Sequence, residues 1–316
     1  MKNILIAGIT GQDGLYLTKQ LLESQENYNI YGVTREKNSL FFDRLKTITN
    51  NETKNIFLNE VSLMNSKEVS QFVLDVEPDY VVNLSGPSSV YNSFRNKNDS
   101  FQIEEIFKNL FKSLQKLKKF PNFFQASSSE MYGNNEKIHQ NETGPFNPIS
   151  PYAVSKYKIH NSIQNYTNTL EGNVVSGIMF NHESKFRGNN FLFKKISKYA
   201  KNHKKGTSKL KLGSLDYVRD WSFAEDICEG IYELLISDKR GSYVLGSGEG
   251  TSIKYVVEKI FSVYGLDWED RVTVDTSLLR TGDPENIISN PKKIFSKLNW
   301  KTKHKIDQTI EKCIEI

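Results

Sequence analysis

Short apolar segments alternate with longer amphipathic segments through the first 180 residues of the 316-residue chain. The apolar segments are predicted strands, at 3–8, 30–34, 54–60, 80–84, 123–127 and 174–180. Helical patterns lie between them, the clearest over 103–117, and a first helix runs from Gly14. Nearly continuous apolar strands separated by amphipathic helices are typical of a parallel sheet covered on both faces. The alternation therefore predicts an α/β fold with a parallel sheet of six or seven strands.

The second half of the chain departs from this alternation. Residues 184–214 are basic and loop-rich around a helical core, 222–236 and 251–264 are predicted helices, 242–245 is a predicted strand, and 281–290 is a predicted loop. No repeat, low-complexity tract or Gly/Ser-rich linker separates the two halves. We therefore expect a smaller C-terminal substrate-binding domain that is interleaved with the sheet domain.

Composition excludes several classes of protein. Hydrophobic residues make up 37% of the chain and aromatic residues 12%, which supplies a core and excludes disorder, collagen and coiled coils. No apolar run approaches the roughly 18 residues of a membrane span, and the N-terminus lacks a signal-peptide cleavage pattern. With only Cys228 and Cys313 present, we expect a cytoplasmic protein without a disulfide framework and without a metal. The net charge of +5 suits an anionic substrate and does not require nucleic acid.

A glycine-rich turn directly follows the first predicted strand. Gly8, Gly11 and Gly14 are spaced three apart where the first helix opens. Glycines at such a turn let the backbone approach a pyrophosphate, and the helix N-terminus offers free N–H groups and positive dipole. An ordinary glycine-rich turn is the alternative, but the position between a strand and a helix favours a Rossmann-type dinucleotide site. The expected cofactor-binding residues of the turn are Gly8, Thr10, Gly11, Gln12, Asp13 and Gly14.

Arg35 follows the second predicted strand and bears on the choice of cofactor. An acidic residue there usually binds the ribose of NAD, whereas Arg accommodates the 2′-phosphate of NADP. We therefore expect NADP, with NAD possible because Glu36 would repel a phosphate and because Arg35 could be a solvated surface residue. Glu60 ends the third strand, where it could accept from the adenine amino group or simply face solvent.

A second motif lies at 150–156, where a predicted helix begins with Ser150 at its cap and Pro151 at its first position. Tyr152 and Lys156 are four residues apart and share one helical face. A nearby ammonium stabilises a phenolate, and the lysine can also hydrogen-bond a ribose. Ser128 ends the fifth strand, at the carboxyl edge of the sheet, where ligands bind in such folds. A Tyr-x-x-x-Lys pair alone is common on surfaces, but together with the glycine turn and Ser128 it indicates catalysis.

These motifs resemble the extended short-chain dehydrogenase/reductase family, and the longer strings resemble its GDP-mannose 4,6-dehydratases. The resembling strings are 8–14, 125–133, 150–156, 180–184, 212–216 and 219–221, with a weaker recurrence around 280–300. The strings most specific to that subgroup are Asn181-His182-Glu183-Ser184 and Arg219-Asp220-Trp221. The resemblance implies a nucleotide-sugar substrate, a nicotinamide cofactor and a homodimer or homotetramer. It also implies that 1–178 and 216–247 form the dinucleotide-binding Rossmann domain, and that 179–215 and 248–316 bind the nucleotide sugar.

The resemblance implies a role for each matching residue. The implied catalytic residues are Ser128, Glu130, Tyr152 and Lys156, and Leu84, Tyr152 and Lys156 join the cofactor-binding set with Arg35 and Glu60. The implied substrate-binding residues are Ser88, Asn181, Glu183, Arg187, Lys195, Arg219, Arg280 and Asp283. Arg and Lys suit a diphosphate, which needs several charge-assisted donors, and Asp283 falls where the family has an acid for the guanosine ribose. Lys195 lies in a Lys-rich helix and could equally be solvated.

Three departures from the family pattern bear on the sugar and on the cofactor phosphate. The loop 85–90 lacks the family's His, Arg35-Glu36 replaces a pair of arginines, and Lys185-Phe186-Arg187-Gly188 replaces Pro-Arg-Arg-Gly. None of them affects the implied catalytic groups.

The function implied is a nucleotide-sugar 4,6-dehydratase that acts on a GDP-hexose, with GDP-mannose the expected substrate. Glu130 lies two residues beyond Ser128, roughly 6–7 Å along an extended chain, and could reach C5 and C6 of the same sugar. The alternatives are a C4 reductase, an epimerase, a decarboxylase or a dehydratase of another sugar in the same superfamily. A cofactor-binding regulator that kept the fold is a further alternative, but such proteins usually lose Tyr or Lys of the pair.

Overall fold

A computed structural model of the chain describes residues 1–35, 40–135, 137–167, 169–204, 208–280 and 282–314. The chain forms two compact units. Unit 1 comprises 1–131, 148–179 and 228–243, and unit 2 comprises 132–147, 180–227 and 244–316. Among the described residues, no helix is both long and apolar enough to cross a bilayer.

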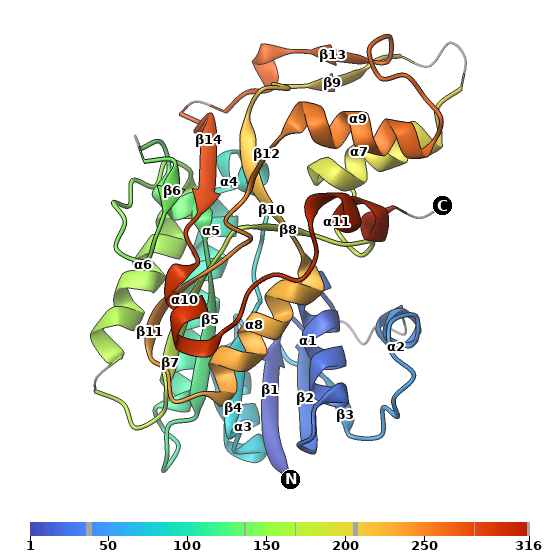
Figure 1. The fold of residues 1–316 in the computed structure, drawn as a ribbon. Helices are drawn as coiled ribbons and strands as arrows, with labels where there is room; N and C mark the ends of the chain where they lie inside the picture. Colours follow the sequence, from blue (N-terminus) through green and yellow to red (C-terminus); the bar gives the residue numbers. More distant parts are fainter. Residues whose placement is uncertain (36–39, 136, 168, 205–207, 281, 315–316) are drawn as a thin grey trace. The chain divides into compact units, whose positions relative to one another are not determined.

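Unit 1 is built from strands that alternate with helices (Figure 1). Its strands are β1 (Lys2–Ala7), β2 (Tyr28–Thr34), β3 (Ile56–Glu60), β4 (Tyr80–Asn83), β5 (Asn122–Ser128), β7 (Val174–Met179) and β11 (Gly241–Leu245), the last of which reaches into unit 2. Its helices are α1 (Gln12–Glu23), α2 (Leu40–Lys46), α3 (Ser66–Val76), α4 (Val90–Arg95), α5 (Lys97–Leu114) and α6 (Pro151–Tyr166), together with most of α8 (Ala224–Ile236). A 3₁₀ turn, η1 (Ser129–Tyr132), follows β5 directly.

The seven strands form one sheet in the order β11-β7-β5-β4-β1-β2-β3. The pairings of β1 with β2 and β4, of β2 with β3, and of β5 with β4 and β7 are all parallel. The strand order reverses between β1 and β4, and ligands bind in α/β sheets at the carboxyl ends of the strands beside such a point. This sheet confirms the predicted Rossmann-type α/β fold and places the glycine turn after β1 at the reversal.

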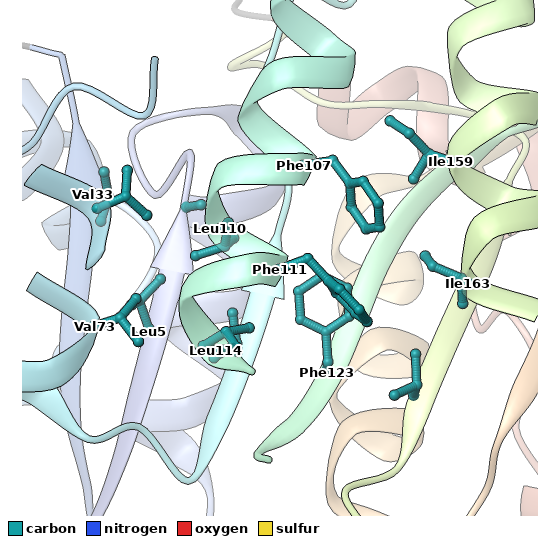
Figure 2. Close-up of a cluster of buried hydrophobic side chains, with 14 of the residues drawn as sticks. Leu5, Val33, Val73, Phe107, Leu110, Phe111, Leu114, Phe123, Ile159 and Ile163 are labelled. Atoms are coloured by element: carbon teal, nitrogen blue, oxygen red, sulfur yellow. The ribbon is translucent and has the colours of Figure 1, made fainter. Parts of the chain in front are cut away.

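A large aromatic cluster covers one face of the sheet. Phe107 and Phe111 of α5 stack with ring centres 5.2 Å apart, and Phe111 meets Phe123 of β5 edge-on at 5.4 Å. Figure 2 shows these rings beside the side chains of Ile159 and Ile163 of α6. The packing fixes α6 against β5, and α6 carries the Tyr-x-x-x-Lys pair.

Unit 2 contains short strands and four longer helices around a second core. Its strands are β6 (His139–Gln140), β8 (Asn181–Glu183), β9 (Leu210–Leu212), β10 (Val218–Phe223), β12 (Gly250–Ser252), β13 (Val272–Val274) and β14 (Asn286–Ser289). Its helices are α7 (Leu192–Lys201), α9 (Ile253–Val263), α10 (Lys292–Leu298) and α11 (Ile306–Cys313), with a 3₁₀ turn η2 (Thr276–Leu278). β10 pairs with β8, β12 and β14, and β14 also pairs with β6. Phe193, Trp221 and Ile260 are buried between these elements.

The predictions for the second half of the chain need correction in two places. The segment 281–290, predicted as a loop, contains strand β14, and the helix predicted from Ser222 begins at Ala224 because β10 extends to Phe223. The expected domain boundaries also differ from the contact units. Residues 216–227 and 244–247, expected with the sheet, belong to unit 2, and the partners of β10 among the described residues are strands of that unit. Residues 132–147 join unit 2 as well, where β6 pairs with β14.

Candidate active site

Two glycines of the turn after β1, Gly8 and Gly14, lie where a larger residue would be strained or would clash. Gly8 has φ +88°, and a Cβ there would lie 3.0 Å from the carbonyl carbon of Leu84, just after β4. A Cβ on Gly14 would lie 2.3 Å from the Ile9 carbonyl oxygen, so Gly14 lets α1 begin directly against the turn. Gly11 is the N-cap of α1 and brings no side chain to cover the helix N-terminus. The turn therefore has the shape that a pyrophosphate cradle requires, and its residues fit a dinucleotide cofactor.

The start of α6 is fixed by conventional capping. Ser150 Oγ accepts from the Ala153 backbone N–H at 3.0 Å, and Pro151 occupies the first turn. The Tyr152 backbone N–H donates to Ser93 Oγ of α4 at 3.3 Å, and the Ser93 hydroxyl donates to the Val90 carbonyl at 2.7 Å. The cap residue and the neighbouring helix α4 thus both position the helical turn that carries Tyr152.

Lys156 is buried one turn further along the same helix, with 6% of its surface exposed. Its Nζ donates to the carbonyl of Ala126 in β5 at 2.8 Å and lies 5.7 Å from the centre of the Tyr152 ring. Burial lowers the pKa of the Lys156 ammonium to about 8, and the carboxylate of Asp13 on α1 opposes that shift. The ammonium therefore stays charged at neutral pH beside the tyrosine.

The end of β5 positions Ser128 and Glu130. Ser128 is the last strand residue and is buried, and its Oγ accepts from the Glu130 backbone N–H at 3.2 Å. That bond fixes the chain as it turns from β5 into η1, with Glu130 half-buried in the turn. Because the Ala126 carbonyl that holds Lys156 belongs to the same strand, the structure brings α6 and the Ser128 end of β5 together.

Other predicted cofactor residues of unit 1 follow the carboxyl ends of neighbouring strands. Arg35 is exposed directly after β2, and Glu60 is exposed at the end of β3, where it pairs in register with Thr34. Leu84 follows β4 and donates its N–H to the Ala7 carbonyl at 2.9 Å. Ser88, which was predicted to bind the substrate, is exposed in the loop before α4. Glu36, expected to repel a phosphate, lies outside the described residues.

In unit 2, two predicted arginines meet on one carboxylate. Asp283 accepts from Arg219 Nη2 at 3.2 Å and from Arg280 Nη2 at 2.7 Å, both at Oδ1, and Arg280 Nε donates to Oδ2 at 3.2 Å. Arg219 Nη1 also donates to the carbonyls of Val218 and Glu285. Asp283 therefore holds the two guanidinium groups side by side in the described structure, a contact that the sequence did not predict.

The other predicted substrate residues have different surroundings. Asn181 is half-buried at the start of β8, and Glu183 at its end is buried and ion-paired with Arg187 at 3.6 Å. The Arg187 guanidinium lies 3.6 Å from the centre of the Phe191 ring. Lys195 Nζ donates to the Lys211 carbonyl at 2.9 Å, and burial lowers the pKa of its ammonium. Arg187 and Lys195 thus both have intramolecular partners.

Sequence reasoning missed two buried side-chain amides, one on β4 and one on β5. Asn83 and Gln125 are 2% and 1% exposed, and Asn83 Nδ2 donates to Gln125 Oε1 at 2.9 Å. Gln125 Nε2 donates to the same Ala126 carbonyl that accepts from Lys156. The signal that could have found them is a polar residue inside an apolar strand, as in Tyr80-Val81-Val82-Asn83 and Phe123-Phe124-Gln125.

Comparison with known families gives a match over nearly the whole chain. The family model described as GDP-mannose 4,6 dehydratase matches residues 5–313. The chain is 32% identical to GDP-mannose 4,6 dehydratase 1 of Arabidopsis thaliana, with 99% of this chain and 89% of the relative covered. It is also 32% identical to the human GDP-mannose 4,6 dehydratase, with 98% and 90% covered.

Solved structures with the same fold include dehydratases and epimerases of nucleotide sugars. A dTDP-glucose 4,6-dehydratase from Bacillus anthracis in complex with NAD has a TM-score of 0.84 at 20% identity, covering 99% of this chain and 95% of the other. A UDP-glucose 4-epimerase from Thermotoga maritima with UDP-glucose has a TM-score of 0.81 at 19% identity, covering 98% and 96%. At these identities the likeness establishes the fold.

Proposed function

Because the chain belongs to the GDP-mannose 4,6-dehydratase family, we propose that it converts GDP-mannose into its 4-keto-6-deoxy derivative with a bound nicotinamide cofactor. The observation that supports this most is the arrangement at the end of β5, where Glu130 follows Ser128 beside the Tyr152–Lys156 pair. Oxidation at C4 requires the serine, tyrosine and lysine. The elimination of water that defines a dehydratase requires a carboxylate in addition.

In the first half of the reaction, Tyr152 acts as a phenolate and removes the proton of the C4 hydroxyl. The Lys156 ammonium, 5.7 Å from the tyrosine ring, stabilises that phenolate in a buried site where charge is little screened. Ser128 Oγ–H hydrogen-bonds the oxygen that becomes the C4 ketone. When bound, the nicotinamide supplies the redox chemistry by taking up the C4 hydride and giving it back at C6.

In the second half, Glu130 carries the elimination. The C4 ketone acidifies the C5 proton, Glu130 removes that proton, and the same carboxyl group protonates the leaving C6 hydroxyl as water departs. C5 then takes up one proton, which balances the proton that Tyr152 removed from the C4 hydroxyl, so the net change is the loss of one water from the sugar.

Unit 1 supplies the proposed cofactor site and unit 2 the proposed GDP site. The shape of the turn at Gly8 and Gly14 supports a dinucleotide, and an exposed arginine after β2, Arg35, supports NADP over NAD. In unit 2, Arg219 and Arg280 are proposed to bind the diphosphate, for which two guanidinium groups held together suit a doubly charged ligand. Asp283, whose carboxylate binds both arginines, is proposed to orient them.

The test is incubation of purified protein with NADP and a panel of GDP-, UDP- and dTDP-sugars, followed by product mass. We expect a product 18 Da lighter from GDP-mannose, by the loss of one water. A product of unchanged mass would indicate an epimerase, and a dehydrated product from another sugar alone would overturn the proposed substrate. We also propose a homodimer or homotetramer, which light scattering at micromolar concentration tests, with a monomer contradicting it.

A further inference from the structure

Four hydrogen bonds link the loop after β4 to the nitrogen of Lys156. The Ser85 N–H donates to Asn83 Oδ1 at 3.2 Å, and Asn83 Nδ2 donates to Gln125 Oε1 at 2.9 Å. Gln125 Nε2 then donates to the Ala126 carbonyl at 3.1 Å, and Lys156 Nζ donates to that same oxygen at 2.8 Å. All of these residues lie in unit 1.

The two ends of this series of hydrogen bonds fix the orientation of both side-chain amides. A backbone N–H can only donate, so the Asn83 atom that faces Ser85 is the oxygen, and its NH₂ faces Gln125. A carbonyl can only accept, so the Gln125 atom that faces Ala126 is the nitrogen. Rotation of either amide by half a turn would break hydrogen bonds at both of its ends, at a position that water does not reach.

The strand register leaves the Ala126 carbonyl beyond the end of β4. The last paired residues of β4 and β5 are Asn83 and Gln125, whereas β5 continues to Ser128, so its last three residues, Ala126 among them, extend beyond the pairing with β4. Two side-chain donors, from Gln125 and Lys156, meet on this oxygen. Because both donors share one oxygen, each of them weakens the hydrogen bond that the other makes with it.

We propose that Gln125, held by Asn83, is a positioning residue for Lys156: its amide shares the Ala126 carbonyl and limits how strongly that oxygen stabilises the ammonium. The effect of this positioning on the reaction rests on the proposed function. The charge state of Lys156 is a property of the chain itself.

Other titratable groups near Lys156 act in different directions. Asp13 on α1 favours the ammonium, and burial disfavours it. Tyr152 lies on the same helix one turn before, and Glu130 follows the end of β5. One turn after, His160 binds Ser176 of β7 at 2.8 Å, and burial lowers its pKa to about 4, so it is neutral where Lys156 titrates. In the described structure the Ala126 carbonyl accepts from Gln125 and Lys156. The effect of a change at Gln125 on the Lys156 pKa can therefore be separated from the effects of these groups.

The experiment follows the titration of Lys156 directly, by NMR of the ligand-free protein labelled with ¹³Cε-lysine, with Lys156→Arg to assign the signal. Gln125→Met keeps the length of the side chain and removes the donor. It should raise the pKa of Lys156 by about 0.5–1 unit, the size of one neutral hydrogen bond. Gln125→Glu should raise the pKa further, because it adds a negative charge. Gln140→Met is the matched control, since Gln140 is equally buried but donates to Asn135 and to the Lys137 carbonyl.

A shift in the two Gln125 variants but not in Gln140→Met supports the proposal. An unchanged Lys156 titration in a folded Gln125→Met overturns it, and if that variant fails to fold, an unchanged titration in Gln125→Glu does so. The basic limb of the kcat/KM profile should move with the NMR value. If no variant, the unmodified protein included, dehydrates GDP-mannose while the NMR shift appears, the proposed function fails and the positioning role stands.

Discussion

The ammonium nitrogen of Lys156 lies 5.7 Å from the ring centre of Tyr152, one helical turn away and in a buried site. At that distance the charge acts on the ring through its field, and solvent screens it little. The Ala126 carbonyl holds the Lys156 ammonium in this position. The pair therefore has the arrangement of a base and a fixed counter-charge that the proposed function requires.

Tyr152→Phe tests the role of the phenol. The variant keeps the ring in its core position but has no oxygen to take the C4 proton, so the oxidation should fall by roughly 10²–10⁴-fold. Single-turnover absorbance of the reduced cofactor measures this step. Tyr157→Phe on the same helix is the control and should oxidise at the unmodified rate. Unimpaired oxidation by Tyr152→Phe would exclude it as the base.

The fold and the positions of the proposed catalytic residues could be predicted from sequence because their signals are local. Buried strands are continuous apolar runs, Gly8 and Gly14 mark a turn that only glycine allows, and Tyr152 and Lys156 share a helical face by spacing alone. The sheet, its glycine turn and the family were accordingly predicted correctly.

What sequence could not supply are contacts between residues that are distant in the chain. Nothing local pairs Asn83 with Gln125 or brings Ala126 to Lys156, since both contacts depend on the strand order. The same holds for β14, whose residues 286–289 follow Pro284 and read as a loop. They form a strand because β10 and β6 lie on either side.

Arg35→Ala tests the proposed preference for NADP. Loss of a charge-assisted hydrogen bond should weaken NADP binding about ten- to a hundred-fold and leave NAD binding nearly unchanged. Isothermal titration with each cofactor measures both. Lys54→Ala removes a positive charge just before β3, at the amino ends of the parallel strands, whereas Arg35 lies at their carboxyl ends. This variant should affect the binding of neither cofactor. Equal weakening of both cofactors by Arg35→Ala would contradict the preference.

His160 should make the protein sensitive to mild acid. Burial against Ser176 and Ser242 lowers the pKa of His160 to about 4 from an ordinary 6.5. The unfolded chain therefore binds a proton below about pH 6.5 that the folded chain refuses until about pH 4. The free energy of unfolding should fall by roughly 3 kcal/mol as the pH decreases across that window.

Urea unfolding at several pH values between 7.5 and 4.5 measures this loss. His160→Gln should flatten the pH dependence, whereas His139→Gln, at an exposed histidine, should leave it unchanged. An equally steep loss of stability in His160→Gln would assign the acid sensitivity to other groups.

Asp283→Asn tests the proposed orientation of Arg219 and Arg280. Without the carboxylate the two guanidinium groups repel each other and lose their shared partner. We expect KM for the GDP-sugar to rise about tenfold with kcat little changed, the pattern of lost ground-state binding. Steady-state kinetics measures both constants, with the exposed Asp267→Asn as the control. A fall in kcat at constant KM would contradict a role in binding.

We propose that Glu130 is the residue that makes this chain a dehydratase, and the substitution Glu130→Gln tests that role. The variant keeps the shape of the side chain and the backbone N–H that donates to Ser128, but removes the base. With GDP-mannose and NADP, absorbance at the wavelength of reduced cofactor and product mass are followed together. We predict that C4 is still oxidised, so that reduced cofactor accumulates, while the 4-keto-6-deoxy product falls by at least about 10²-fold. Dehydration at the unmodified rate would show that Glu130 is not the base and would contradict the proposed mechanism.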